Sequence, residues 1–358
     1  MINIVINNDI IEKHKNYIKE QNISKKIDEE LLNLTYQKDL KREKRGNFLK
    51  EHIAFCTFLK HEIDRLDQEN DNLFLGKVEY LANVIEKVKK HYNNVQQYIL
   101  EKPGYSGKIL KVMGYKKFAA SCEVKNKNMT YTINNFTTDE KDFGWGAYAY
   151  VMNLGMRVCP YCNRNYITPI YSHNGKARAE LDHFFSKARY PYLSLSIYNL
   201  VPACAYCNSS LKGSEEFTYS NNFHPMDAIQ ARELYRMTYM PQNIDCFWGG
   251  EEYDIEIEYN HDKIGWETIK KNHEVFKIKE LYQYHKDLVS HILKKRYIYD
   301  EAYINYLWNS YPNLFKNKEE VVEFLIIPYD NFTVENIPLG KLLVDLQEEL
   351  FPEIQYHQ

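Results

Sequence analysis

Two CxxC pairs are the residues of this chain whose types and spacing most clearly indicate a chemical role. The pairs are Cys159 with Cys162 and Cys204 with Cys207, and 41 residues separate them. Four thiolates on two tight turns form the ligand set that a structural Zn²⁺ ion takes in closed tetrahedral coordination. We therefore expect these four cysteines to bind one zinc ion.

Two disulfides, or one redox-active CxxC, are the other chemistries open to these cysteines. Disulfides need an oxidising compartment, and residues 1–15 lack the apolar core and the cleavage pattern of a secretory signal. A redox motif would explain one pair only. No run approaches the roughly 18 apolar residues of a membrane span. The sequence thus predicts a cytoplasmic protein without a membrane segment, and this favours zinc.

Polar residues between and beside the pairs could carry out hydrolysis. They are the adjacent Asp182 and His183, then Asn199, then Asn208 directly after the last cysteine. Cleavage of a phosphodiester needs a deprotonated water and a cation on the oxygens that gain charge. An imidazole suits the first task, and a hard ion held by oxygen ligands suits the second. His183 and Asp182 would supply one of each.

A second interpretation assigns these residues to structure alone. Asp182 and His183 would then be polar residues of a zinc module that only binds nucleic acid. Asn199 would be a turn residue, and Asn208 would cap a helix N-terminus. His224, beside a proline, is interpreted as a structural histidine rather than a ligand.

Residues 180–183 (ELDH) and 199–213 (NLVPACAYCNSSLKG), flanked by CxxC pairs, resemble the HNH endonucleases with their ββα-metal active site. The resemblance implies that His183 is the general base. It implies that Asp182 and Asn208 bind a catalytic Mg²⁺ or Mn²⁺ ion, and that Asn199 positions the loop and the histidine. Glu180 and Lys212 would support these residues.

The chain also resembles the HNH subunits of bacterial anti-phage systems of the Septu type. This resemblance implies an effector nuclease that acts on DNA and works with a separate ABC-type ATPase. An RNA substrate such as tRNA is the alternative. The chain itself has no P-loop and no dinucleotide-binding fingerprint. The oligomeric state and the substrate's sequence stay open.

Charge is unevenly distributed along the chain. The whole sequence has a net charge of −3, yet residues 155–214 contain seven Lys or Arg against two acidic residues, a local net of +5. Such a region attracts phosphate backbones. The expected nucleic-acid contacts are Arg164, Lys187, Arg189 and Lys212. The basic run at residues 38–50 is interpreted as a solvated helix junction.

The helices and strands expected from the sequence predict an α+β fold. A mostly helical body would surround a small ββα-metal module that is held together by zinc. We expect a helical region at residues 1–140, the nuclease module at 141–225, and a mostly helical region with a β-hairpin at 226–358. Within the module, the Asn174-Gly175 turn predicts a hairpin whose returning strand leads to Asp182 and His183. A helix is expected to start near Asn208.

Outside the module the predictions are coarser. Residues 1–12 are expected to form a short strand or a frayed start. Helices are expected from Ser24 to Leu40, from Asn47, and from Leu73 to a stop at Pro103-Gly104. Residues 105–140 are expected to be a linker with a weak strand at 131–133, followed by a helix at 143–151 that braces the module.

In the last third, residues 253–259 are expected to pair with residues 245–248. Helices are expected at 275–306, 318–325 and 338–350. Cys56, Cys122 and Cys246 are expected to be structural, and His285 and His291 are not expected to be ligands.

Overall fold

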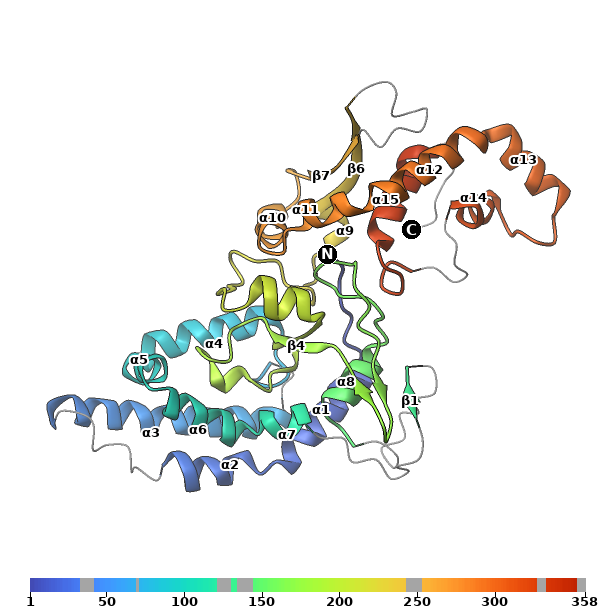
Figure 1. The fold of residues 1–358 in the computed structure, drawn as a ribbon. Coiled ribbons are helices and arrows are strands. Elements are labelled where there is room, and N and C mark those ends of the chain that lie inside the picture. Colours follow the sequence, from blue (N-terminus) through green and yellow to red (C-terminus); the bar gives the residue numbers. More distant parts are fainter. Residues whose placement is uncertain are drawn as a thin grey trace. The chain divides into compact units, whose positions relative to one another are not determined.

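The computed structural model is an α+β chain with many helices and small antiparallel sheets (Figure 1). It describes residues 1–32, 42–68, 71–120, 130–133, 144–242, 253–326 and 333–352. Cys122, Cys246, residues 245–248 and the first part of the 38–50 run therefore lie outside the described residues. No helix among the described residues has the length and apolar character that crossing a membrane requires.

The chain forms two compact units. The larger unit comprises Asn3–Met156 and Ile167–Ala228, and the smaller unit comprises Met1–Ile2, Arg157–Tyr166 and Ile229–Gln358. Each is described by itself below.

Helices make up the first half of the larger unit. They are α1 (Asn8–Glu20), α2 (Ile23–Lys26), the π-helical turn Ile27–Leu31, α3 (Arg42–Asp64), the 3₁₀ turn Arg65–Asp67, α4 (Val78–His91), α5 (Asn93–Glu101), α6 (Pro103–Met113), α7 (Tyr115–Ala120) and α8 (Ala147–Leu154). Helices α3, α5 and α6 pack on one another (Figure 1). Their buried faces hold large apolar side chains such as Phe55, Tyr98 and Ile109.

The start of the chain differs from the predicted strand. Helix α1 begins after Asn7, whose side-chain oxygen accepts a hydrogen bond from the Ile10 amide at 2.9 Å. An asparagine in this position satisfies one of the amides that a helix N-terminus leaves unpaired. The expectation of a short strand or a frayed start was wrong for residues 8–12, where this cap was overlooked, whereas residues 1–7 form neither helix nor strand.

The predicted linker after Pro103 was also wrong over residues 105–120, which form α6 and α7. Proline has no amide hydrogen and is favoured in the first turn of a helix, so Pro103 starts α6 as well as following α5. Gly114 then ends α6 with a φ of 81°, a left-handed conformation that glycine adopts without strain. The expected single helix from Leu73 is divided at Tyr92 into α4 and α5.

Two small antiparallel sheets complete the larger unit. In the first, β1 (Tyr131–Thr132), β2 (Ile170–Tyr171) and β3 (Lys176–Ala177) lie side by side, and β2 and β3 form the predicted Asn-Gly hairpin. In the second, β4 (Glu180–His183) pairs with β5 (Leu200–Ala203), with His183 opposite Leu200 at one end. A π-helical segment, η6 (Tyr206–Lys212), follows β5. The order is strand, strand, helix.

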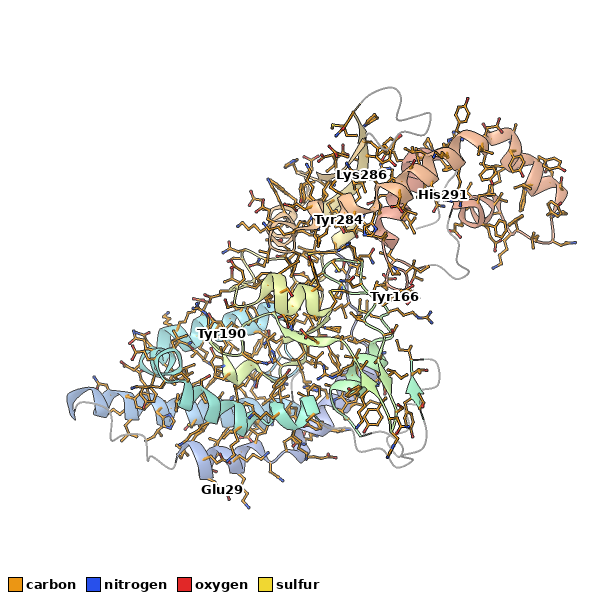
Figure 2. The ribbon with its side chains drawn as sticks, viewed as in Figure 1. Glu29, Tyr166, Tyr190, Tyr284, Lys286 and His291 are labelled. Carbon is orange, nitrogen blue, oxygen red and sulfur yellow. The ribbon has the colours of Figure 1, made fainter. Side chains whose placement is uncertain are left out.

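The smaller unit contains one longer hairpin and a set of helices. Strands β6 (Tyr235–Pro241) and β7 (Tyr253–Tyr259) pair along their whole length, which gives β7 a partner that was not predicted. The predicted partner, residues 245–248, lies outside the described residues. The helices are α9 (Ala231–Leu234), α10 (Trp266–Val275), α11 (Ile278–Tyr282), the 3₁₀ turn Gln283–His285, α12 (Lys286–Ile298), α13 (Glu301–Ser310), α14 (Lys318–Ile326) and α15 (Gly340–Leu350). Lys286 and His291, labelled in Figure 2, both lie on α12.

Candidate active site and metal centre

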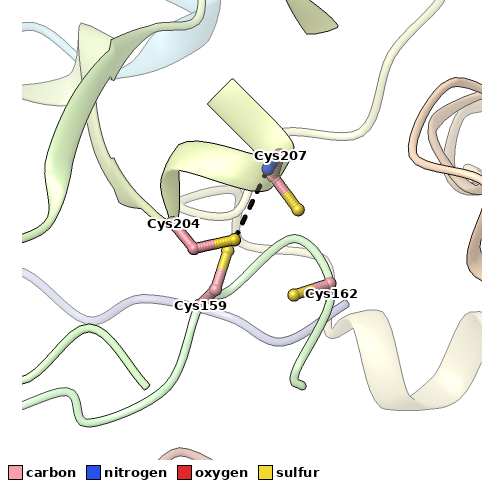
Figure 3. Close-up of side chains that lie close together, drawn as sticks. All are labelled: Cys159, Cys162, Cys204 and Cys207. Atoms are coloured by element: carbon pink, nitrogen blue, oxygen red, sulfur yellow. Dashed lines mark hydrogen bonds between the residues drawn. The ribbon is translucent and has the colours of Figure 1, made fainter. Parts of the chain in front are cut away.

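The four cysteines of the CxxC pairs come together. Their sulfur atoms all lie within 4.8 Å of one another, and all four side chains are buried (Figure 3). In a regular tetrahedron around Zn²⁺, with Zn–S bonds of about 2.3 Å, the sulfurs would be about 3.8 Å apart. None of the four is in a disulfide. The cluster therefore fits a structural zinc ion in both donor chemistry and spacing.

Each cysteine pair is folded as a knuckle in which backbone amides point at sulfur. The Cys207 amide donates to Cys204 Sγ at 3.4 Å, and the Arg164 amide donates to Cys162 Sγ at 3.5 Å. Such bonds favour the thiolate, which is the form that binds metal.

Asn163 anchors the first knuckle. This residue adopts a left-handed conformation, with a φ of 50°, and is fully buried. Its side chain accepts a hydrogen bond from the Lys341 amide and donates one to the Val334 carbonyl, each at 2.8 Å. The turn that carries Cys162 is thus held by the segment that leads into α15.

His183, at the end of β4, is oriented by a backbone carbonyl. Its Nε2 lies 3.1 Å from the Ser194 oxygen, which can only accept a hydrogen bond. The proton of the neutral ring is therefore on Nε2, and Nδ1 keeps its lone pair. Burial lowers the pKa of His183 to about 3, and the charges of Lys187 and Lys212 act in the same direction. The imidazole is thus neutral at physiological pH, and its Nδ1 lone pair is not occupied by a proton.

Asn199 holds the loop around this histidine. Its Oδ1 accepts from the Phe185 amide at 2.7 Å, and its Nδ2 donates to the carbonyls of Phe185 and Leu193, both at 3.1 Å. The side chain is fully buried. Because Leu193 precedes the residue whose carbonyl binds His183, the Asn199 amide fixes the segment that orients the imidazole.

Asp182 is paired with a lysine from η6. Lys212 Nζ lies 2.8 and 2.7 Å from the two carboxylate oxygens of Asp182, and it also donates to the carbonyls of His183 and Phe184. Asp182 and Lys212 are 4% and 5% exposed, so the pair is shielded from water. Lys212 therefore holds the end of β4.

Asn208 is inside η6 rather than at its start. Its amide nitrogen donates to Glu180 Oε2 at 2.8 Å, and the Ser209 hydroxyl donates to the same oxygen. A carboxylate accepts hydrogen bonds from the amide nitrogen, so Oδ1 is the Asn208 atom that remains for a ligand. The expected helix cap at Asn208 was wrong, because its side chain binds Glu180 on β4 and the residue before η6 is Ala205.

A cleft of about 630 Å³ opens over these residues. Its lining includes the candidate site residues Asp182, His183 and Asn208, together with Lys187, Arg189 and Lys212. One carboxylate and one amide oxygen are a donor set that suits Mg²⁺ or Mn²⁺, which keep several waters in such sites. These donor types fit the predicted divalent ion, but Lys212 Nζ lies 2.8 and 2.7 Å from the two Asp182 oxygens, so an ion at Asp182 would share the carboxylate with that ammonium group.

The four expected nucleic-acid contacts differ in their surroundings. Arg164 donates to His285 Nε2 at 3.0 Å, and Arg189 forms an ion pair with Glu216 at 3.0 Å. Tyr190, labelled in Figure 2, donates to the same glutamate at 2.9 Å. Lys212 is bound to Asp182. Lys187 is exposed, and in the part of the chain that the structure describes no hydrogen bond or ion pair involves its ammonium group.

Sequence reasoning missed one aromatic residue beside the site. The Tyr115 ring, at the start of α7, lies edge to face with His183, with centroids 4.6 Å apart. Its position in a region predicted as linker gave no signal. His224 is fully buried and its Nδ1 accepts from the Met226 amide at 3.0 Å, which agrees with a structural role.

No protein-family model, curated protein or solved structure matches this chain. The arguments for its function therefore come from the geometry of the site.

Proposed function

We propose that this chain is a metal-dependent HNH endonuclease that hydrolyses phosphodiester bonds, with DNA as its first candidate substrate. The observation that carries the proposal is the β4–β5–η6 arrangement. It brings His183, Asp182 and Asn208 to one cleft and ties the histidine to the Ser194 carbonyl, with Nδ1 left to accept a proton.

In the proposed reaction, His183 Nδ1 accepts a proton from a water molecule as that water attacks phosphorus. The Ser194 carbonyl holds the ring and stabilises the positive charge that develops on it. Asn199 keeps this carbonyl in place through its bond to Leu193. A divalent ion, held by Asp182 and by Asn208 Oδ1, would supply stabilisation of the charge on the phosphate oxygens and of the leaving oxyanion.

We further propose that the four cysteines bind zinc for a structural purpose. The second knuckle leads directly into η6, so its metal would set the position of the helix that carries Asn208.

The biological setting proposed for this activity is antiviral defence together with a separate ATPase. It rests on the sequence resemblance and on the absence of a P-loop. It predicts that addition of the partner ATPase changes the cleavage rate of the purified nuclease.

The experiment is incubation of the purified chain with supercoiled plasmid and, separately, with total tRNA, each with Mg²⁺, with Mn²⁺ and with chelator. His183→Ala should lower the cleavage rate by roughly 10²- to 10⁴-fold, the contribution usual for a general base. His173→Ala is the matched control, because His173 is exposed in the β2–β3 turn. Cleavage of tRNA alone would make the chain a ribonuclease.

Equal activity of His183→Ala and His173→Ala would refute the assigned base. A folded, zinc-loaded protein that binds nucleic acid and cuts neither substrate, with or without the ATPase, would favour the alternative of a non-catalytic zinc module.

A further inference from the structure

Tyr115 lies beside the candidate site and has no role in the hydrolysis proposed above. Tyr115 comes from α7, a helix of the N-terminal part of the larger unit, and its ring touches two residues of the cleft. One is His183, edge to face at a centroid distance of 4.6 Å. The other is Lys187, whose ammonium nitrogen lies over the ring, 4.9 Å from its centroid.

The two contacts constrain two different groups. A ring against the buried imidazole leaves it few alternative rotations, and the Ser194 carbonyl already fixes one of its nitrogens. A cation over an aromatic face is attracted by the negative charge density of the ring, which limits the range of a flexible lysine. Tyr115 therefore sets the distance between the candidate base and a positive charge.

That charge is available to a substrate. The other two cations of the cleft are engaged, Lys212 with Asp182 and Arg189 with Glu216. Lys187 is exposed on the cleft wall, and among the described residues its ammonium group forms no hydrogen bond or ion pair. The Tyr115 ring attracts this group without neutralising it, and the Asp182 carboxylate acts on it only through its electrostatic field. A phosphate that enters the cleft would meet this ammonium group.

We propose that Tyr115 is a positioning residue that places the His183 imidazole and the Lys187 ammonium group relative to each other, and that Lys187 binds the scissile phosphate. The inference rests on the proposed nuclease function. It makes the N-terminal helices part of the active site, although Tyr115 stands far from the ββα elements in the sequence.

The test measures kcat and KM with the plasmid or tRNA substrate that the wild-type chain cuts. Tyr115→Leu removes the ring and should lower kcat by about tenfold to 10²-fold through misplacement of the base. Tyr115→Phe keeps the ring and should restore kcat to within about threefold of wild type, because neither contact uses the hydroxyl.

Lys187→Met should raise KM and reduce the slope of log affinity against log salt by about one phosphate contact, roughly 0.9 on duplex DNA. Lys116→Met is the matched control, since Lys116 lies next to Tyr115 and is exposed. It should leave both constants unchanged. In the double variant Tyr115→Leu/Lys187→Met, the two effects should be less than additive because the ring acts partly through the lysine.

Several outcomes would overturn the inference and leave the nuclease assignment intact. They are an active wild type with unchanged kcat in folded Tyr115→Leu, failure of Tyr115→Phe to restore kcat, or a Lys187→Met variant that behaves like Lys116→Met. If Tyr115→Leu does not fold, the Lys187 variants still decide the second half of the claim. A wild type that cuts nothing would refute the proposed function, and this inference with it.

Discussion

Lys212 keeps its positive charge inside the larger unit, where water cannot compensate it. Its ammonium group has four oxygen partners, two of them from the Asp182 carboxylate. Burial lowers the pKa of Lys212 and the nearby carboxylate opposes that shift. A charge pair of this kind is expensive to break because the remaining partner is left buried and unpaired.

Lys212→Met, which keeps most of the side-chain volume, is therefore expected to lower the free energy of unfolding by about 3–5 kcal/mol. The double variant Asp182→Asn/Lys212→Met should recover part of this loss, since it removes both charges. Urea unfolding at pH 7 is the measurement. A loss below about 1 kcal/mol in the single variant would mean that the pair contributes as little as an exposed one.

At the scale of elements, η6 links the second cysteine knuckle to the site. Cys207 and Asn208 are neighbours on it, and Lys212 is its last residue. The positions of both polar residues thus depend on a segment that contains the proposed metal ligand Cys207. Metal binding energy and folding energy are then coupled.

Cys204→Ser is expected to reduce the zinc content from about one ion per chain to nearly none and to destabilise η6. Asp182→Ala should leave the zinc content unchanged, because Asp182 is not among the clustered cysteines. Metal analysis after dialysis, with circular dichroism on the same samples, separates the two variants. Full zinc retention in Cys204→Ser would rule out the four-cysteine site.

Some of these structural features could be predicted from the sequence, and others could not. The Asn-Gly hairpin was predicted because that dipeptide favours a tight turn locally, and β2 and β3 confirm it. The cysteine cluster was predicted because metal ligands constrain distant segments. The contact of Tyr115 with His183 could not be predicted, since no local pattern tells which helix packs against a strand end.

At the scale of the whole molecule, several buried histidines are expected to make the folded chain less stable at acidic pH. Burial lowers the pKa of His14 to about 4, and those of His183 and His224 to about 3. Each pKa lies below the unfolded value near 6.5, so the unfolded chain binds more protons between these limits. Stability is then fully present above pH 6.5 and is lost as the pH falls toward 4.

We expect each of these histidines to reduce the free energy of unfolding by roughly 2 kcal/mol between pH 7 and pH 5. Thermal unfolding followed across this range is the measurement. His14→Gln should flatten the dependence, whereas His173→Gln, at an exposed position, should leave it unchanged. A melting temperature that stays constant from pH 7 to pH 5 would contradict the buried neutral histidines.

The bond between Glu180 and Asn208 also restricts which substitutions evolution could accept at this site. Asn208→Asp would offer a catalytic ion a stronger ligand, but it would set two carboxylates 2.8 Å apart where an amide now donates. Like charges at that separation repel unless one carboxylate stays protonated. A change at Asn208 alone would therefore cost stability, and a tighter ion site would need Glu180 to change as well. The Glu180 bond thus favours an amide at position 208, which under the proposed function would hold a divalent ion less tightly than a carboxylate.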